Sequence, residues 1–164
     1  MSYFVRKFAK PKWTRTAIND NPFDIPSDVI CSDLKTADNT LSVWEIEDET
    51  KLEDAVLAIT SGGDRLDTID IIWIEKREIE MKGVSYKQSP GDTPIKQFVD
   101  THVDLCQLSY YKIGLVAESI SEKVARDVQI KRYTQTDLKK IYKSAISNGI
   151  IDKDSLKSGI SNSL

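Results

Sequence analysis

The chain contains a single histidine, His102, which limits the chemistry that its side chains could perform. A zinc site with several histidines, a two-histidine acid–base pair and an iron site with two histidines are excluded. Cys106 follows His102 by four residues, the spacing that places two side chains on one face of a helix. The two could form a cysteine–histidine couple or supply two of the four ligands of a zinc ion. We favour a histidine hydrogen-bonded to the backbone and a small buried thiol.

A second set of residues has the types that hold Mg²⁺ for phosphodiester cleavage. Asp70 opens an apolar segment, and ten residues later Glu80 and Lys82 have the Glu-x-Lys spacing of restriction-endonuclease-like active sites. There the carboxylates would hold the metal ion and the lysine would stabilise developing charge. The triplet follows the expected strand instead of lying within it, and such triplets are common in charged chains. A solvated charged loop is therefore the competing interpretation.

Carboxylates are also concentrated where an expected strand ends and a helix begins, at Glu45, Glu47, Asp48 and Glu49. A carboxylate at a helix N-terminus gains at best ~0.3–1 kcal/mol from the helix dipole, and not all of these can benefit. The excess is compatible with an acidic surface that docks a basic protein partner. The alternative is a solvated face without a partner.

The first sixteen residues combine basic and aromatic side chains and contain no acidic residue. Basic side chains can hold phosphates while aromatic rings stack on bases, which makes this segment a candidate for nucleic-acid binding. The alternative is an edge strand with one apolar face, protected by lysines from pairing with other chains. The residues concerned are Arg6, Lys7, Lys10, Lys12 and Trp13.

The net charge of −3 hides a strong segregation of charge along the chain. Residues 1–16 carry +5, residues 17–122 carry −13 and residues 123–143 carry +5. Two functional interpretations are a basic face for nucleic acid and an acidic face for a basic partner. Because nucleic-acid-binding domains usually have a basic overall balance, we favour basic ends that fold back onto the acidic middle or are simply solvated. The sequence contains neither a phosphate-binding glycine loop nor a Gly-x-Ser-x-Gly elbow, and we expect no cofactor and no metal site.

Length and composition indicate one ordinary globular domain, with 164 residues of which 40% are hydrophobic and 30% charged. No apolar run approaches the ~20 residues of a membrane span, and the N-terminal segment lacks the apolar region of a signal peptide. Two cysteines make a weak disulfide framework. We therefore expect a cytoplasmic location and no membrane association.

Hydrophobic periodicity predicts strands and helices in alternation. Helices are expected at 27–34 and at 50–59, the latter with Thr50 as N-cap. A closing helix, capped by Thr134 or Thr136 and ended by Gly149, is expected to turn inward Leu138, Ile141, Tyr142 and Ala145. The apolar run from 70 to 75 indicates a strand buried on both faces. The strands are expected at 3–9, 41–46, 70–75 and 128–133.

These elements predict a single α+β domain over residues 1–151, with a small mixed sheet of about four strands packed by two to four helices. Residues 14–40 are expected to form a long irregular connection, and the polar residues 152–164 a mobile tail. The pattern over residues 94–125 predicts one long helix, ~45 Å at 1.5 Å per residue, or two shorter ones. A helix of that length would exceed a small domain and could pair two copies of the chain as a homodimer.

The absence of catalytic motifs and the segregated charge together favour a non-enzymatic protein-interaction module. We expect a small accessory or inhibitor subunit, of the immunity-protein type, that docks its partner through the acidic surface. A metal-dependent nuclease or phosphoryl-transfer enzyme is the alternative, and a nucleic-acid binder is the second alternative.

Overall fold

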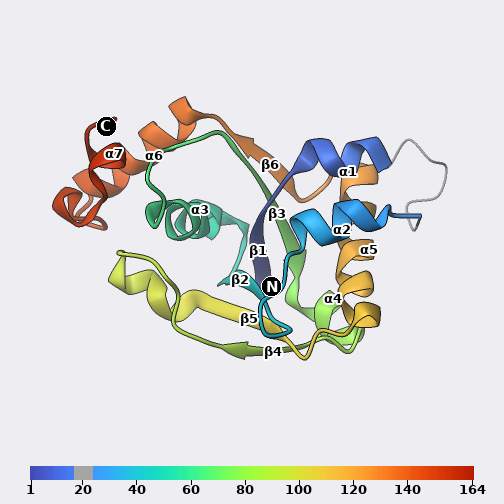
Figure 1. Ribbon diagram of the computed structural model, residues 1–164. Helices are drawn as coiled ribbons and strands as arrows, with labels where there is room; N and C mark the ends of the chain where they lie inside the picture. The colour runs from blue at the N-terminus through green and yellow to red at the C-terminus, as the bar shows by residue number, and fades with distance from the viewer. Residues whose placement is uncertain (17–23) are drawn as a thin grey trace.

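The computed structural model describes residues 1–16 and 24–164, which form one six-stranded antiparallel sheet between two groups of helices (Figure 1). The spatial order of the strands is β4-β5-β2-β1-β3-β6. The α+β class is confirmed, but the expected mixed sheet of about four strands is wrong in detail. The strands are β1 (Tyr3–Phe8), β2 (Leu41–Ile46), β3 (Ile69–Glu75), β4 (Ser85–Gln88), β5 (His102–Cys106) and β6 (Ile130–Tyr133).

Seven α-helices and three short 3-10 helices connect these strands in the described residues. The α-helices are α1 (Lys10–Thr16), α2 (Ser27–Asp33), α3 (Leu52–Ser61), α4 (Lys76–Met81), α5 (Tyr110–Arg126), α6 (Gln135–Ser147) and α7 (Ser158–Ser161). The 3-10 helices are η1 (Glu49–Lys51), η2 (Lys96–Thr101) and η3 (Lys153–Ser155).

Each face of the sheet carries its own hydrophobic core. Successive side chains of a strand point to opposite faces, so Phe4 and Val5 of β1 belong to different cores. The α3 and α6 helices, η2 and the C-terminal α7 cover the Val5 face. The α1, α2, α4 and α5 helices cover the Phe4 face, and Figure 1 shows the two groups on either side of the sheet.

The inner strands β3 and β1 are covered by helices on both faces of the sheet, and this explains their burial. The apolar run of β3 is almost entirely buried, and β3 pairs with β1 and β6, as its sequence predicts. The β1 strand also lies inside the sheet, between β2 and β3, so the interpretation of its basic and aromatic residues as a protected edge strand is wrong. The side chains of β1 are covered on both faces of the sheet. The alternation of residues within one strand does not show whether that strand lies at the edge or inside the sheet.

The region from 94 to 125 is not one helix, nor two helices. It contains η2, then β5, then α5, which begins only at Tyr110. Val103 and Leu105 face one core while His102 faces the other, which is the period-2 pattern of a strand. Five residues are too few for that pattern to stand out from the helical spacing on either side. With 17 residues, α5 is about 26 Å long, well short of the expected ~45 Å.

The expected irregular connection and mobile tail both contain ordered structure. Of the expected connection 14–40, residues 17–23 lie outside the described residues, and the described part contains the end of α1 and the whole of α2, the helix that the sequence predicted. The C-terminal residues form η3 and α7, and they bury Leu156 and Ile160 in the core under α6. Residues 152–164 are mostly polar, so their composition did not indicate that Leu156 and Ile160 are buried, at 6% and 0% exposed.

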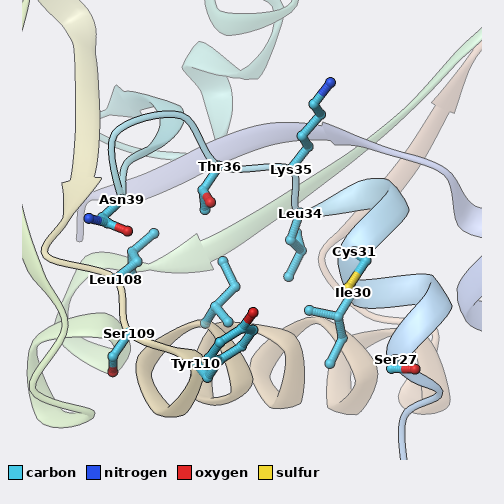
Figure 2. Close-up of a pocket in the computed structure, with 11 residues that line it drawn as sticks. Ser27, Ile30, Cys31, Leu34, Lys35, Thr36, Asn39, Leu108, Ser109 and Tyr110 are labelled. Atoms are coloured by element: carbon cyan, nitrogen blue, oxygen red, sulfur yellow. The ribbon is translucent and has the colours of Figure 1, made fainter.

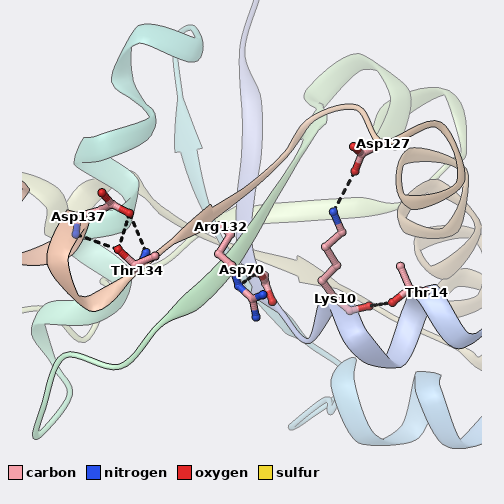
Figure 3. Close-up of polar contacts among 7 residues, drawn as sticks. All are labelled: Lys10, Thr14, Asp70, Asp127, Arg132, Thr134 and Asp137. Atoms are coloured by element: carbon pink, nitrogen blue, oxygen red, sulfur yellow. Dashed lines mark hydrogen bonds and ion pairs between the residues drawn. The ribbon is translucent and has the colours of Figure 1, made fainter.

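The α6 helix forms as its sequence predicts. The side chain of Thr134 accepts a hydrogen bond from the Asp137 amide, and the Asp137 carboxylate accepts one from the Thr134 amide, as Figure 3 shows. The four inward residues expected from the period are all buried. At the α3 helix, in contrast, Asp48 caps the preceding η1 turn, and Thr50 is not the N-cap.

Among residues 1–16 and 24–164, no helix combines the length and the apolar character needed to cross a membrane.

Candidate functional site

Four carboxylates gather at one end of the sheet, and we call them the acidic end: Glu47, Asp48, Glu49 and Glu75. Strand register brings them together, because Tyr3 of β1 is opposite both Ile46 at the end of β2 and Glu75 at the end of β3. The chain then turns from β2 into η1, which places Glu47, Asp48 and Glu49 beside the same end. In the described part of the chain, none of the four forms an ion pair with a lysine or arginine.

Tyr3 and Trp73 lie at the centre of this end. The Trp73 indole N–H donates to Glu49 Oε1 over 3.0 Å, and Tyr3 interacts with Glu49 as well. Burial raises the pKa of the Tyr3 phenol, and the nearby carboxylates of Glu49 and Glu75 raise it further. Glu49 is therefore held in place by two aromatic side chains, and the carboxylates of Glu49, Glu75 and Asp48 all act on Tyr3.

Asp48 and Glu47 differ in their local roles. Asp48 accepts hydrogen bonds from the amide and the hydroxyl of Thr50, and these bonds lower the pKa of its carboxyl. Glu47 is exposed, and its side chain makes no hydrogen bond within the described residues. Glu47 is consequently the position where charge can be changed with the least effect on the fold.

Glu45, the fourth residue of the sequence-predicted acidic set, lies apart from the acidic end. It pairs with Lys76 at 2.7 Å, and this hydrogen bond raises the pKa of the Lys76 ammonium. The same ammonium lies 4.8 Å from the centre of the Tyr86 ring. Glu45 thus fixes α4 against the sheet, and its charge is neutralised locally.

The three residues of the nuclease hypothesis are not brought together. Asp70 lies at the start of β3, while Glu80 and Lys82 follow its end, and the strand alone separates these ends by about 17 Å. Asp70 is buried and pairs with Arg132 of β6 at 3.2 Å (Figure 3). Glu80 accepts a hydrogen bond from Tyr86, and Lys82 pairs with Glu118. In the chain as far as it is described, no three His, Cys, Asp or Glu residues are grouped so that they could hold a metal ion.

His102 and Cys106 share a face of a strand, so the expected helical placement is wrong. The ring of His102 is buried against Trp44, and its Nδ1 lies 3.0 Å from Ser89 Oγ and 3.2 Å from the Ser89 carbonyl oxygen. The Ser89 hydroxyl donates to Asp104 Oδ2 over 2.6 Å. Its proton is directed to the carboxylate and not to the imidazole, which differs from a serine nucleophile activated by histidine. These bonds fix the chain after β4 onto β5.

The basic residues near the N-terminus do not form one exposed surface. Arg6 is inserted between segments and donates to the carbonyl oxygens of Ser42 and Asp33, at 2.7 and 3.1 Å. Burial lowers the pKa of its guanidinium. The buried Trp13 donates to the Asp33 carboxylate at 2.6 Å.

The lysines of this set are also partly engaged. Lys10 pairs with Asp127 at 2.9 Å (Figure 3), and Lys12 donates to the Ser32 hydroxyl. Lys7 is exposed. Arg6 and Trp13 therefore anchor α1 and α2 to the sheet, and they are not available to contact phosphates or bases.

The structure also contains a groove that the sequence did not suggest. It lies between α2 and the N-terminus of α5, has a volume of about 540 Å³, and is shown in Figure 2. Its apolar floor comes from two pairs of residues, Ile30 with Leu34 and Leu108 with Ile113, and the two pairs are more than 70 residues apart in the chain. No local pattern could reveal it, because β5 and its flanking loops bring the two segments together.

The chain matches no protein-family model, no curated protein and no solved structure.

Proposed function

We propose that this protein is a non-enzymatic interaction module that docks a basic protein partner through its acidic end. The observation that carries the proposal is the group of four carboxylates at this end of the sheet, of which Asp48, Glu49 and Glu75 act on Tyr3, and none of the four forms an ion pair with a lysine or arginine in the described chain. Like charges placed together destabilise a fold by their mutual repulsion. A basic partner surface would relieve that repulsion on binding.

The chemistry of the acidic end suits a protein interface. Carboxylates attract a basic surface over a distance and increase the rate of encounter, an effect that salt weakens. Tyrosine is enriched among the residues that contribute most to binding energy, and here the partly buried Tyr3 lies among the carboxylates. Charge would then bring the partner to the surface, and Tyr3 would supply close contacts.

In this proposal the chain acts as a small accessory or inhibitor subunit in the cytoplasm. Its size and acidity fit the immunity type, in which a small protein neutralises a basic target by covering it. The buried Asp70 and the separated Glu80 and Lys82 give the nuclease hypothesis no assembled site. The engaged Arg6 and Trp13 likewise give no support to nucleic-acid binding.

The test is affinity purification of the tagged chain from its host, followed by identification of co-purifying proteins. The variant is Glu47→Lys, because this carboxylate is exposed and makes no hydrogen bond within the described residues. The control is Asp64→Lys, which changes the net charge equally at an exposed carboxylate in the loop before the opposite end of β3. It also removes the exposed ion pair between Asp64 and Lys157, a kind of pair that contributes little to stability. We expect a stoichiometric partner with the unmodified chain and with the control, and a loss of at least about tenfold with Glu47→Lys.

Two results would contradict the proposal. One is a partner whose binding is equal for Glu47→Lys, Asp64→Lys and the unmodified chain. The other is the absence of any stoichiometric partner under low-salt conditions, where electrostatic attraction is strongest. Melting temperatures of both variants, measured in parallel, show whether a loss of binding arises from unfolding.

A further inference from the structure

The two middle strands of the sheet, β1 and β2, separate before the end of β1 and leave a slot between them. Their pairing ends at Val5 and Trp44, whereas β1 stays paired with β3 as far as Phe8, and β2 stays paired with β5 back to Leu41. A cavity of about 340 Å³ lies at this opening, a volume at the lower end of small-molecule sites. Its apolar walls include Phe8, Trp44 and Ile59 of α3.

The indole N–H of Trp44 is a donor without an acceptor at this slot. The side chain is only 8% exposed, and its N–H makes no hydrogen bond within the described residues, although the nitrogen is open to solvent. The Cη2 and Cζ3 end of the ring packs under Gly91, and the N–H is on the opposite edge. Trp13 and Trp73, in contrast, each donate to a carboxylate. Because indole N–H groups usually have a partner when they are buried, the Trp44 donor can serve a bound acceptor in the cavity.

Arg6 places a positive charge at the slot, and no ion pair of the described chain balances it. Its guanidinium donates to the carbonyl oxygens of Ser42 and Asp33, and its Nε is buried without a hydrogen-bond partner. Burial lowers the pKa of this group, although the Asp33 carboxylate acts in the opposite direction. That carboxylate already accepts hydrogen bonds from the Ala9 amide and the Trp13 indole. A negative charge in the slot would stabilise the guanidinium through space and leave its bonds to the two carbonyls intact.

Lys7 brings a second positive charge to the face of the sheet on which Trp44 lies. Lys7 follows Val5 by two residues, and Val5 pairs with Trp44, so the Lys7 and Trp44 side chains share a face on either side of the slot. Both line the cavity, and Lys7 has no ion-pair partner in the described chain. With two positive residues, Arg6 and Lys7, and the negative Asp33, the lining carries a net charge of +1, which one carboxylate would balance.

We infer that the slot between β1 and β2 binds a small organic acid, whose carboxylate accepts hydrogen bonds from the Trp44 indole and the Lys7 ammonium. The apolar body of the acid would contact the walls formed by Phe8, Trp44 and Ile59, while Arg6 would act by its charge alone. The inference does not depend on the acidic end, which lies at the Tyr3 end of β1, whereas the slot lies at the Phe8 end.

The test follows the three indole N–H signals of the isotope-labelled full chain by NMR during a titration with benzoate. We expect a saturable shift of the Trp44 signal. The signals of Trp13 and Trp73 should stay in place, because their N–H groups are already bonded to carboxylates. Benzamide has a similar shape without the charge, and it should bind at least about tenfold more weakly than benzoate.

Two variants connect the shift to the proposed donors. Lys7→Gln should weaken benzoate binding at least about fivefold, since it removes the charge of one donor. The matched control is Lys87→Gln, at an exposed lysine of the edge strand β4, and it should bind benzoate as the unmodified chain does. Trp44→Phe keeps an aromatic ring and removes the N–H, so it should weaken binding by a similar factor, measured from the backbone amide signals of β1. If Trp44→Phe fails to fold, the indole shifts and the two lysine variants decide.

Four results would overturn the inference. They are the absence of a saturable shift, equal movement of all three indole signals, benzamide binding as tight as that of benzoate, and equal benzoate affinities of Lys7→Gln and Lys87→Gln. Tighter binding of inorganic phosphate than of benzoate would replace the carboxylate with a phosphate group. Melting temperatures of the variants show whether each is folded.

Discussion

Two buried tyrosines show how a single hydroxyl can stabilise or destabilise the fold. The Tyr142 hydroxyl lies 2.9 Å from Thr60 Oγ1, whereas the Tyr133 hydroxyl is buried and no hydrogen bond to it occurs within the described residues. We expect Tyr142→Phe to lower the free energy of unfolding by ~0.5–1.5 kcal/mol, the net value of a hydrogen bond. Tyr133→Phe should leave it unchanged or raise it, because it removes an unsatisfied polar group.

Urea denaturation of the two variants beside the unmodified chain measures both effects. The two substitutions serve as controls for each other, since each removes one oxygen atom from a fully packed tyrosine under α3 or α6. Equal losses of stability in the two variants would contradict the assignment of the Tyr133 hydroxyl as unsatisfied.

The same tyrosines predict how stability depends on alkaline pH. Burial raises the pKa of both Tyr133 and Tyr142 to about 12, and the carboxylates of Glu53 and Asp137 contribute at Tyr133. The corresponding pKa in an unfolded chain is about 10. Below pH 10 the phenols are protonated in both states, so their contribution to stability is fully present. As the pH rises from 10 to 12, the unfolded chain loses these protons first, and the contribution is lost.

Denaturation at pH 8, 10 and 11 measures this loss. We expect the free energy of unfolding to fall between pH 10 and 11, and to fall less steeply in Tyr133→Phe and Tyr142→Phe than in the unmodified chain. A fall of the same size in all three proteins would mean that other groups cause it.

At the scale of elements, the C-terminal residues belong to the core and are not an appendage. Ile160 is fully buried, and a Cβ atom added at Gly159 would lie only 2.0 Å from the Asp64 carbonyl oxygen. We expect Ile160→Ala to lower the free energy of unfolding by about 2–5 kcal/mol, the usual cost of truncating a buried isoleucine. Gly159→Ala should also destabilise, because the backbone of the loop before β3 would have to move.

Chemical denaturation measures these losses, with Ser163→Ala as the control in the same segment. The segment is accessible to truncation as well, and a chain that ends at residue 151 should unfold at a lower denaturant concentration. If Ile160→Ala matched Ser163→Ala, α7 would not be packed in solution.

The elements that could be predicted are those whose signal is local and long. The apolar run of β3 and the capped, periodic α6 follow directly from their residues. The β5 strand could not be recognised, since its five residues lie between two helical segments and its inner His102 is polar. Likewise the sequence showed that Glu47, Asp48 and Glu49 are together, but Glu75 and Tyr3 join them only through strand register. The residues of a strand do not indicate which distant strand it pairs with, so this part of the acidic end could not be predicted.

For the whole molecule, the arrangement of the sheet determines where opposite charges meet. The basic segment 123–143 meets the acidic middle of the chain through Lys123, which pairs with Glu78 at 2.6 Å, and through Arg132, which pairs with the buried Asp70. Part of the segregated charge is thus compensated within the fold. The carboxylates near Tyr3 are not compensated by such ion pairs in the described chain.

The same arrangement predicts the oligomeric state. A homodimer was expected because a single helix over residues 94–125 would have extended beyond one domain, but α5 has 17 residues and buries its apolar side in its own chain. Beyond the exposed Tyr110 and Tyr111 of its first turn, this helix offers no long apolar stripe to a second copy. We therefore expect sedimentation velocity at tens of micromolar to give one species with the mass of a single chain. Twice that mass, unchanged by Tyr110→Ala, would require an interface elsewhere on the molecule and would contradict this view of α5 as a helix used entirely within its own fold.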